Sequence, residues 1–532
     1  MAARTHTAFV TVGVCLVLAS GVGMSQGASV PLQTGTALHS QTNLSVDYAI
    51  DGLYGTSWHS GWGDDISGVR PANDAAFETV SDVAGYDTGT LLTFTLDHRS
   101  WNQHGIGNLR LSITQADRSQ FADDADNGGQ IGSPAIWTQL TPILAHSSGG
   151  STLTIQPDNR ILASGTNPNN DVYTVWAVTD MKNITGVRLE TPKDASLPHN
   201  GPGRSGSNGN FVLTEFTMDE SQPVGGTDAP VDVVSGGKTA TASQQGFGGS
   251  AANGIDNNPN PNSWVHSASG AGGWWEVDLG GTMPLTDITV HARSGLPERI
   301  DGATVKFLDH AGATVATRTV DIPTGQLTDT ITLDGQVTAR RVRIEHTGDY
   351  MNFMEFDARA VDVALGKDTM QSTNHGSFSA YGSEATDGNL GSITHTAGGD
   401  QQPTLVVALG GLYHVDSILL HNRDDCCGDR LSDLVVDVLD QDLNTVFSTG
   451  PLNVGNAMGS PAFIGIDMHQ LIGDDLLGQY VRIQKTGGTG GMYLSLGEVQ
   501  VFGSPVPEPA TMCALGLAVA GLGGYLRRRR RA

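Results

Sequence analysis

Short apolar runs and alternating apolar and polar positions recur along the chain from residue 30 to residue 503, and none of them keeps a helical period. Examples are LLTFTL at 91–96, ITVH at 288–291 and LVVDVL at 434–439, separated by segments rich in Gly, Asn, Asp and Pro. Such runs between turn residues predict strands, and many short strands in succession are typical of β-sandwiches. The pattern therefore predicts an all-β body.

A repeat with a period of about 130 residues runs through the second half of this body. GIDNN at 254–258 recurs as ATDGN at 385–389, and the acidic residue of a closing strand recurs as Glu355 and Glu498. Two copies of one domain are therefore expected, behind a less transparent first unit. The predicted organisation is a signal peptide at 1–28, β-sandwiches at 30–225, 233–361 and 362–503, a linker at 226–232, and a C-terminal sorting signal at 506–532.

The charge balance narrows the range of partners. Lys and Arg number 29 against 55 Asp and Glu, which gives a formal net charge of −26. Such an acidic chain lacks the basic surface that nucleic acids or anionic lipids require, so neither is expected as a partner. Four cysteines are too few for a disulfide scaffold.

The N-terminal 28 residues are interpreted as a signal peptide. Arg4 supplies a positive charge, residues 9–18 are apolar, and small residues follow up to Ala28. The apolar run is shorter than the roughly 20 residues that span a membrane. A membrane anchor and a lipoprotein anchored through Cys15 are the alternatives.

The C-terminus carries a more specific signal. VPEPAT at 506–511 precedes an apolar stretch at 512–526 and five arginines at 527–531. This order of a Pro-Glu-Pro tripeptide, a short apolar helix and a basic tail resembles the PEP-CTERM sorting signal. The resemblance implies export, transient inner-membrane anchoring with the arginines inside, and processing by an exosortase. It implies a final place at the cell surface or in the extracellular matrix of a Gram-negative bacterium; the alternative is a plain C-terminal anchor.

The last unit also carries a spaced set of polar residues. His395 is followed after 27 residues by Arg423, and Arg423-x-Asp425-x4-Arg430 encloses two adjacent cysteines. This set resembles the signature of the fucolectins, or F-type lectins, in which 26 residues separate the His from the first Arg. The repeated units as a whole resemble the discoidin (coagulation-factor type C) domain. These resemblances imply galactose-binding-like jelly-roll β-sandwiches, three of them in tandem.

The residue types in this set suit a sugar. Arg423 and Arg430 offer planar forks of N–H donors for neighbouring hydroxyls, and His395 donates or accepts toward another hydroxyl. Asp425, two residues after Arg423, is placed to orient its guanidinium. The resemblance assigns His395, Arg423 and Arg430 as direct ligands of a deoxy sugar of the fucose type. The alternative is a group of polar residues in surface loops.

Cys426 and Cys427 are the only cysteines outside the terminal segments. In an oxidising exterior they pair with each other or across chains, and two free thiols are the alternative. The fucolectin resemblance implies a vicinal disulfide whose sulfur face packs against the sugar.

The second unit keeps part of the signature. His266 precedes Arg293 by the 26 residues of the pattern, and Arg299 follows one position early. Gly295 stands where the Asp belongs, and an apolar Leu-Pro dipeptide replaces the cysteines. We therefore expect the same fold and a candidate sugar site at His266, Arg293 and Arg299, with Arg293 less well oriented in the absence of the Asp.

A structural Ca²⁺ ion is the cofactor that the resemblance implies, held by loops at one end of each repeated sandwich. An Asp-x-Asn loop and a Glu on the terminal strand supply the oxygen ligands that Ca²⁺ prefers. Ordinary Asx turns are the alternative interpretation. The matched positions are Glu384, Asp387, Asn389, Ser392 and Glu498 in the third unit and Asn253, Asp256, Asn258, Ser263 and Glu355 in the second.

The first unit echoes the same loop at Asp51 and the same closing strand at Glu215, and it resembles discoidin-like domains. The His-Arg-Arg signature is not evident in it. Its histidines lack metal-ligand spacing and are interpreted as surface or structural residues; they are His59, His98, His104 and His146.

Catalytic motifs do not stand out in the sequence, which has no Gly-x-Ser-x-Gly elbow, zinc motif or phosphate loop. The first unit is also small for a barrel hydrolase. We therefore expect not an enzyme but an exported lectin-like protein that binds glycans or exopolysaccharide. Two alternatives stay open: a structural matrix protein whose sandwiches have lost their ligand, and a glycan-degrading enzyme with appended binding modules.

Overall fold

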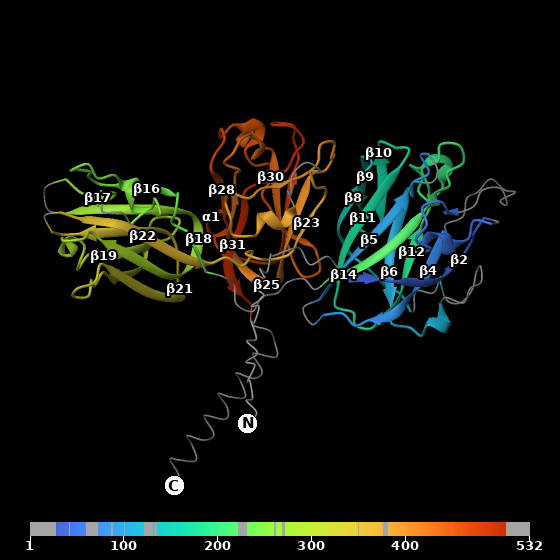
Figure 1. Ribbon diagram of the computed structural model, residues 1–532, viewed down its shortest axis with the longest axis horizontal. Helices are drawn as coiled ribbons and strands as arrows, with labels where there is room; N and C mark the ends of the chain where they lie inside the picture. Colours follow the sequence, from blue (N-terminus) through green and yellow to red (C-terminus); the bar gives the residue numbers. More distant parts are fainter. Residues whose placement is uncertain are drawn as a thin grey trace, which may run out of the picture.

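Antiparallel strands dominate the computed structural model of the chain, which confirms the predicted all-β class (Figure 1). Within the described residues the one α-helix, α1 (Met468–Leu471), is a single turn. No helix in that part of the chain is long and apolar enough to cross a membrane. The structure describes residues 28–506, apart from 42, 60–72, 87–88, 100–101, 122–130, 132–135, 222–230, 260–261, 269–271, 349 and 376–380.

Several sequence predictions therefore lie wholly or largely outside the described residues. They are the signal peptide up to residue 27, most of the linker, and the apolar helix and Arg tail of the sorting signal. At the edges of these segments the structure has strands. β1 (Ala28–Val30) pairs with the last strand of the first unit, and β15 (Val231–Val233) pairs with the last strand of the second from inside the predicted linker.

Two antiparallel sheets enclose the core of the first unit. Their strand orders are β1-β14-β5-β11-β8 and β2-β4-β12-β6-β10-β9, with β7 beside β6 and a separate β3–β13 pair. Alternation drives the packing: along β11, Tyr173, Val175 and Ala177 are buried in the core while the residues between them are half-buried. The strands are β2 (Leu32–Ala37), β3 (Trp58–His59), β4 (Asn73–Val83), β5 (Thr90–His98), β6 (Asn108–Thr114), β7 (Thr138–Gln139), β8 (Pro142–Ser147), β9 (Ser151–Ile155), β10 (Ile161–Gly165), β11 (Asp171–Thr179), β12 (Ile184–Thr191), β13 (Val212–Leu213) and β14 (Glu215–Ser221), and the 3-10 helices are Val46–Ala49, Arg118–Gln120 and Pro198–Asn200.

The second unit is a sheet that bends around its own core. Its main order is β15-β22-β18-β21-β19-β20, with β16 beside β18 and β17 beside β22. The pairing of β18 with β21 breaks between Asp278 and Met283, where Gly280 adopts a φ of 89° that favours glycine. The elements are β16 (Thr239–Ala242), β17 (Val265–His266), β18 (Gly273–Ala292), β19 (Thr304–Leu308), β20 (Thr314–Thr319), β21 (Thr328–His346) and β22 (Asn352–Val361), with 3-10 helices at Ala251–Gly254 and Pro297–Arg299.

The third unit repeats this plan. A long strand, β25 (Thr404–His421), pairs with β29 on either side of a break between Ala408 and Tyr413. The sheet order is β23-β25-β29-β26-β27, with β28 and β31 beside β25 and a separate β24–β30 pair. The elements are β23 (Thr369–Gln371), β24 (Thr394–His395), β26 (Leu434–Leu439), β27 (Thr445–Ser448), β28 (Phe463–Asp467), β29 (Leu476–Lys485), β30 (Ser495–Leu496) and β31 (Glu498–Pro505), with 3-10 helices at Gly382–Ala385, Gly428–Arg430 and Val454–Asn456.

The third unit lies between the other two, although it comes last in the chain (Figure 1). On the side of the second unit, Asp467 accepts hydrogen bonds from the backbone N–H of Thr282 at 3.0 Å and from its hydroxyl at 2.9 Å. Arg340 donates to the same carboxylate at 3.3 Å. Leu419 and Phe502 of the third unit belong to the apolar core of the second.

An apolar cluster joins the third unit to the first. Tyr480 and its neighbours on the third unit are buried against strands β5 and β8 of the first. Burial of this size holds the two sandwiches together, because apolar area removed from water contributes roughly 25 cal/mol per Å². The buried members of the cluster are Leu91, Ile143 and Leu144 on one side and Met370, Val406, Ala408, Leu439 and Tyr480 on the other.

Candidate functional site

A two-residue strand places each predicted histidine beside the strand that closes its unit. In the third unit, His395 of β24 pairs with Ser495 of β30. In the second, His266 of β17 pairs with Asn352 of β22. In both units the facing residue comes three positions before the closing Glu, so the two histidines occupy the same place in the fold.

Register also fixes the first predicted arginine. In the third unit, His421 at the end of β25 pairs with Glu498, and Arg423 follows two residues later. The second unit repeats this arrangement with Arg293 just after β18. The closing strand therefore brings together two residues that the sequence separates by 27 positions in one unit and by 26 in the other.

His395 and Arg430 are in direct contact in the third unit. His395 Nε2 lies 2.7 Å from Arg430 Nη1, and His395 Nδ1 lies 2.6 Å from the carbonyl oxygen of Thr396. A guanidinium only donates, so Nε2 accepts and Nδ1 carries the proton that is donated to the carbonyl. The Arg430 guanidinium lies 4.7 Å from the centre of the Tyr493 ring. The ring and the imidazole thus hold the arginine in place.

The environment keeps this histidine neutral. Burial lowers the pKa of His395, and the positive charges of Arg430 and Arg423 lower it further, against the opposing hydrogen bond to Thr396. A neutral ring is needed here, because an imidazolium would carry a donor toward Arg430 in place of an acceptor.

Sugar binding by the third unit is therefore expected to be insensitive to pH through the ordinary histidine range near about 6.5. Binding should fall only at a lower pH, where His395 becomes protonated and repels Arg430. Asp425 stays ionised throughout, because hydrogen bonds from Arg423 lower its pKa to about 2. Calorimetric titration with L-fucose over a pH series measures the midpoint. A midpoint at or above the ordinary histidine value would contradict this account of the site.

Arg423 is fixed by an ion pair with Asp425. Its Nε and Nη2 donate to the two carboxylate oxygens, both at 2.7 Å. Its Nη1 donates to the hydroxyl of Ser495 at 3.1 Å, the residue that pairs with His395. The structure thus brings His395, Arg423 and Arg430 around one point of the closing strand.

Cys426 and Cys427 form a disulfide next to this arginine. A cavity of about 460 Å³ adjoins it and is also lined by Arg423 and Phe463. One wall comes from the second unit, where Lys238 places its ammonium 4.1 Å from the centre of the Phe463 ring. The groove beside the predicted sugar site is therefore shared by two units.

The second unit reproduces the histidine–arginine contact. Arg299 Nη1 lies 3.2 Å from His266 Nε2, and His266 Nδ1 lies 2.6 Å from the carbonyl oxygen of Ser267. The Arg299 guanidinium lies 5.0 Å from the centre of the Tyr350 ring. The shift of Arg299 by one position in the sequence has not removed the contact.

Arg293 is held without the missing Asp. Its guanidinium stacks 4.2 Å from the centre of the Trp264 ring, and Nη1 donates to Asn352 at 3.2 Å. Asn352 is the residue that pairs with His266, as Ser495 does with His395. An indole face and an amide thus take the place of the carboxylate, which differs from the expected loss of orientation.

Aromatic residues complete both sites, and the sequence reasoning missed them. Tyr350 and Tyr493 each stand five positions before the closing Glu, so an alignment of the repeats on that Glu would have found them. Phe247 has no such signal. It is 64% exposed, and its ring lies 4.8 Å from that of His266 and 5.7 Å from that of Tyr350. It gives the second unit an aromatic surface where the third has His375, whose ring lies 4.8 Å from His395.

The predicted calcium positions of the third unit also come together. The hydroxyl of Ser392 donates to both carboxylate oxygens of Asp387 at 2.9 Å and lies 2.7 Å from the carbonyl oxygen of Asn389. It also lies 3.3 Å from the carbonyl oxygen of Glu384. Glu498 reaches this loop by accepting from the N–H of Gly388 at 3.4 Å. All five predicted residues therefore surround one loop.

The second unit has an equivalent loop. Asp256 accepts from the N–H of Asn258 at 3.0 Å and from the hydroxyl of Ser263 at 2.7 Å. Glu355 accepts from the same N–H at 3.1 Å. The side chain of Asn253 donates at 3.1 Å to the carbonyl oxygen of Trp264, next to Ser263.

The donor set of these loops fits a hard cation. One carboxylate oxygen each of Glu355 and Glu498 is buried and has no hydrogen-bond partner. Burial, together with neighbouring carboxylates, raises the pKa of Glu355 to about 8 and that of Glu498 to about 9. Among the described residues no group of three or more His, Cys, Asp or Glu side chains is arranged around one point, so a cation would also need backbone and Asn or Ser oxygens, as Ca²⁺ accepts.

Two segments of the chain match a known domain family. Residues 253–344 and 384–470 match the model of the NedA-like, galactose-binding domain. Residues 505–531 match the PEP-CTERM protein-sorting motif, which indicates export and surface sorting in a Gram-negative bacterium. No curated protein matches the chain.

Solved structures of lectin modules are also similar to it. A fucolectin from the serum of the striped bass Morone saxatilis is 24% identical over 52% of this chain and 100% of its own, with a TM-score of 0.25. The lectin domain of lectinolysin complexed with Lewis B antigen is 24% identical over 24% of this chain and 95% of its own, with a TM-score of 0.23. The family 32 carbohydrate-binding module of C. perfringens NanJ in complex with galactose is 19% identical over 24% and 99%, with a TM-score of 0.21.

The family match and the shared register agree on the second and third units. The first unit lies outside the matched segments. The chain therefore carries two galactose-binding-like domains of the F5/F8 type C family and ends in a PEP-CTERM sorting motif.

Proposed function

We propose that the chain is an exported carbohydrate-binding protein whose third unit binds a fucose-type deoxy sugar. The observation that carries this proposal is the contact of a neutral histidine, an arginine and a tyrosine at one register position in both repeated units. Two units that differ elsewhere keep this arrangement, and the Asp-for-Trp exchange beside the first arginine preserves its position.

Each group has a separate task toward a sugar. Arg430 has N–H donors left after its contact with His395, and these suit neighbouring ring hydroxyls. Arg423, held by Asp425, supplies a second fork from the other side. The disulfide offers a polarizable apolar surface for the methyl group or ring carbons of a deoxy sugar. A glycan that continues past this point would enter the groove walled by Lys238 of the second unit.

The second unit is proposed to bind a sugar by a different balance of forces. His266 and Arg299 supply polar contacts, whereas Phe247 and Tyr350 supply aromatic surface in place of sulfur. Aromatic rings pack well on the C–H face of a pyranose, so this unit should prefer sugars with a continuous apolar face.

Calcium is proposed as a structural cofactor of both units. Glu498 with Asp387, and Glu355 with Asp256, would hold the ion together with oxygens of Asn and Ser residues and of the backbone. The bound ion would neutralise buried carboxylates that otherwise resist ionisation. This would fix the loop that precedes each histidine strand, close to the sugar site.

Display at the surface is proposed to raise weak single-site affinity. The sorting motif supports processing by an exosortase and transient anchoring in the inner membrane, and the cell surface or the extracellular matrix is the proposed destination. Exopolysaccharide and glycans are the proposed partners, since many weak sites side by side gain avidity. The matched segments are binding domains, so cleavage of the glycan is not part of the proposal.

Calorimetric titration of the full chain with L-fucose tests the function, once with calcium and once with EDTA. The full chain is needed because excision of the third unit would expose the apolar surfaces that it shares with both neighbours. Saturable heat is expected with calcium and weaker binding with EDTA. Absence of heat up to millimolar sugar from a folded chain would contradict the proposal and favour a structural matrix protein.

A further inference from the structure

The first unit holds a histidine at the register position of the two predicted sugar-binding histidines. His59 of β3 pairs with Val212 of β13, and Val212 comes three positions before Glu215. His266 and His395 stand in the same relation to the closing Glu of their own units. The match is hidden in the sequence because the insertion that follows His59 changes its spacing to the next equivalent residue.

Arg99 completes the comparison. Asp97 of β5 pairs with Glu215, and Arg99 follows two residues later, as Arg423 follows the residue that faces Glu498. Arg99 is also clamped by a carboxylate: its Nε donates to Asp97 at 2.6 Å. In the third unit the carboxylate comes two residues after the arginine, and here it comes two residues before.

His104 takes the place of the second arginine. It precedes the first residue of β6 by four positions, as Arg430 precedes the first residue of β26. β6 and β26 are equivalent, since each pairs with the strand beside the long central strand of its sheet. His104 lies close enough to act electrostatically on His59: burial, and then this neighbour, lower the pKa of His59 to about 4.

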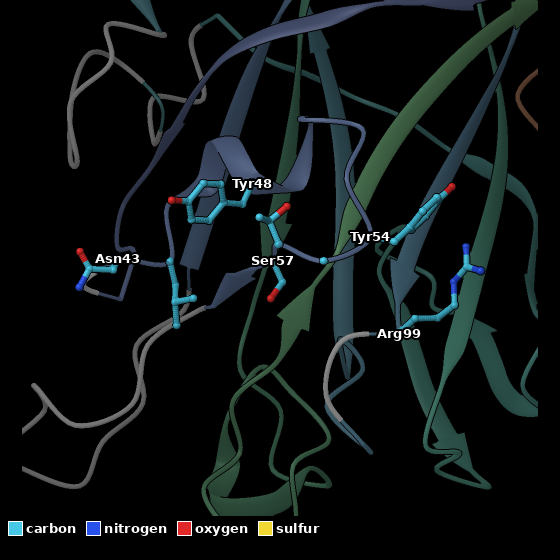
Figure 2. A pocket seen from close by; sticks show the side chains of 8 residues that line it. Asn43, Tyr48, Tyr54, Ser57 and Arg99 are labelled. Atoms are coloured by element: carbon cyan, nitrogen blue, oxygen red, sulfur yellow. The ribbon is translucent and has the colours of Figure 1, made fainter.

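A cavity of about 580 Å³ opens at this place, within the range of about 300–1,000 Å³ that ligand pockets occupy. Figure 2 shows Tyr54 and Arg99 together on one side of it and Ser57 between them and Tyr48. The Ser57 hydroxyl lies 3.2 Å from His59 Nε2, so the histidine stands directly behind the wall. The lining residues are Asn43, Leu44, Tyr48, Tyr54, Gly55, Thr56, Ser57 and Arg99.

Tyr54 gives this pocket an apolar platform. Its side chain is 62% exposed, and the Arg99 guanidinium stacks 4.5 Å from the ring centre. In the third unit the corresponding residue, three positions after the loop Asp, is Leu390, which lines the groove beside Arg423. A stacked arginine with remaining N–H donors beside an open ring presents both halves of a sugar-binding surface.

We propose that this pocket is a third sugar-binding site, which places the C–H face of a neutral pyranose on Tyr54 and its hydroxyls toward Arg99 and Ser57. The inference rests on the proposed function of the other two units, whose register it shares. A neutral sugar is favoured over an anionic one because Asp97 already neutralises Arg99. A fucose-type preference is not expected, since no disulfide lines this pocket.

Affinity chromatography of the full chain on D-galactose and L-fucose resins tests the inference. The starting variant carries Arg299→Ala and Arg430→Ala, which removes the predicted contacts of the second and third units. This variant should lose retention on L-fucose and keep retention on D-galactose. Adding Tyr54→Ala or Arg99→Ala should then weaken galactose binding at least tenfold. Tyr54 is exposed, so its replacement does not threaten folding, which thermal unfolding verifies.

Arg160→Ala is the matched control. Arg160 lies in the same unit and donates through Nε to Asp158, two residues before it, at 2.6 Å, as Arg99 does to Asp97. The control should leave retention unchanged. Failure of the starting variant to bind galactose, or retention that survives both Tyr54→Ala and Arg99→Ala, would overturn the third site. Failure of the unmodified chain to bind L-fucose would instead contradict the function proposed for the third unit.

Discussion

Arg430→Ala is expected to abolish retention of the full chain on an L-fucose resin while leaving the fold intact. The change removes the donor fork of the third unit and leaves His395 Nε2 without its partner at 2.7 Å. Hydrogen bonds to charged groups contribute about 1.5–3 kcal/mol, which corresponds to a loss of about 10–100-fold in affinity. Retention measured by affinity chromatography and confirmed by calorimetry gives the size of the loss.

Two further variants separate the fork from the charge. Arg430→Lys keeps the charge and loses the planar donors, so it should lose most of the affinity. Arg482→Ala is the control, because Arg482 pairs with Asp437 at 2.7 Å on the sheet of the same unit and away from the site. Normal retention of Arg430→Ala would remove Arg430 from the sugar site.

Removal of calcium is expected to give the second large effect, on stability. A ligand at 100 times its dissociation constant stabilises the folded state by about 2.7 kcal/mol per site. For units of this size that corresponds to a fall of roughly 10 °C in the melting temperature when EDTA is added. Differential scanning calorimetry with and without EDTA measures it. An unchanged melting temperature would contradict the calcium proposal.

The calcium effect should grow with pH. Without the ion, burial and nearby carboxylates hold the pKa of Glu498 at about 9 and that of Glu355 at about 8, against an ordinary 4.5. Between these values the folded chain binds protons that the unfolded chain has lost, so cation-free stability falls as pH rises through this window. A bound cation takes the place of those protons, and its stabilisation is therefore largest at the alkaline end.

Glu498→Gln tests the assignment in the third unit. The amide resembles the protonated carboxyl, so the cation-free variant should lose its share of the pH dependence and of the response to calcium. Glu345→Gln is the control, since Glu345 forms a surface ion pair with Lys306 at 2.7 Å. A full calcium response in Glu498→Gln would move the ion away from the closing strand.

The predictability of the site depended on how locally each part is encoded. The run at 434–439 coincides with β26, because alternation along one strand is a local property. The clamp of Arg423 by Asp425 needs only two intervening bonds along the chain and was predicted from spacing alone. Trp264 under Arg293 was not, because its effect depends on a strand pair that joins distant segments.

The first unit shows the same limit more clearly. His59 was interpreted as a surface or structural residue, since no arginine follows it at the spacing of the signature. The register of β3 against β13 and of β5 against β14 nevertheless places His59 and Arg99 as the other units place their histidine and arginine. A loop of any length can separate two strands that pair with the same closing strand, so spacing in the sequence carries no information about their contact.

The sequence by itself determined the all-β class, the repeat, the sorting signal and the polar residues of the third unit, because periodicity, turn residues and short motifs are read along the chain. The tertiary structure alone decided which of these residues meet. It placed the last unit between the other two, gave Arg430 and Arg299 their tyrosines, left one oxygen of Glu498 and one of Glu355 buried without a partner, and put Arg99 beside Tyr54. The physical reason is that antiparallel pairing fixes neighbours across strands by register, and register is set by the packing of whole sheets around a core.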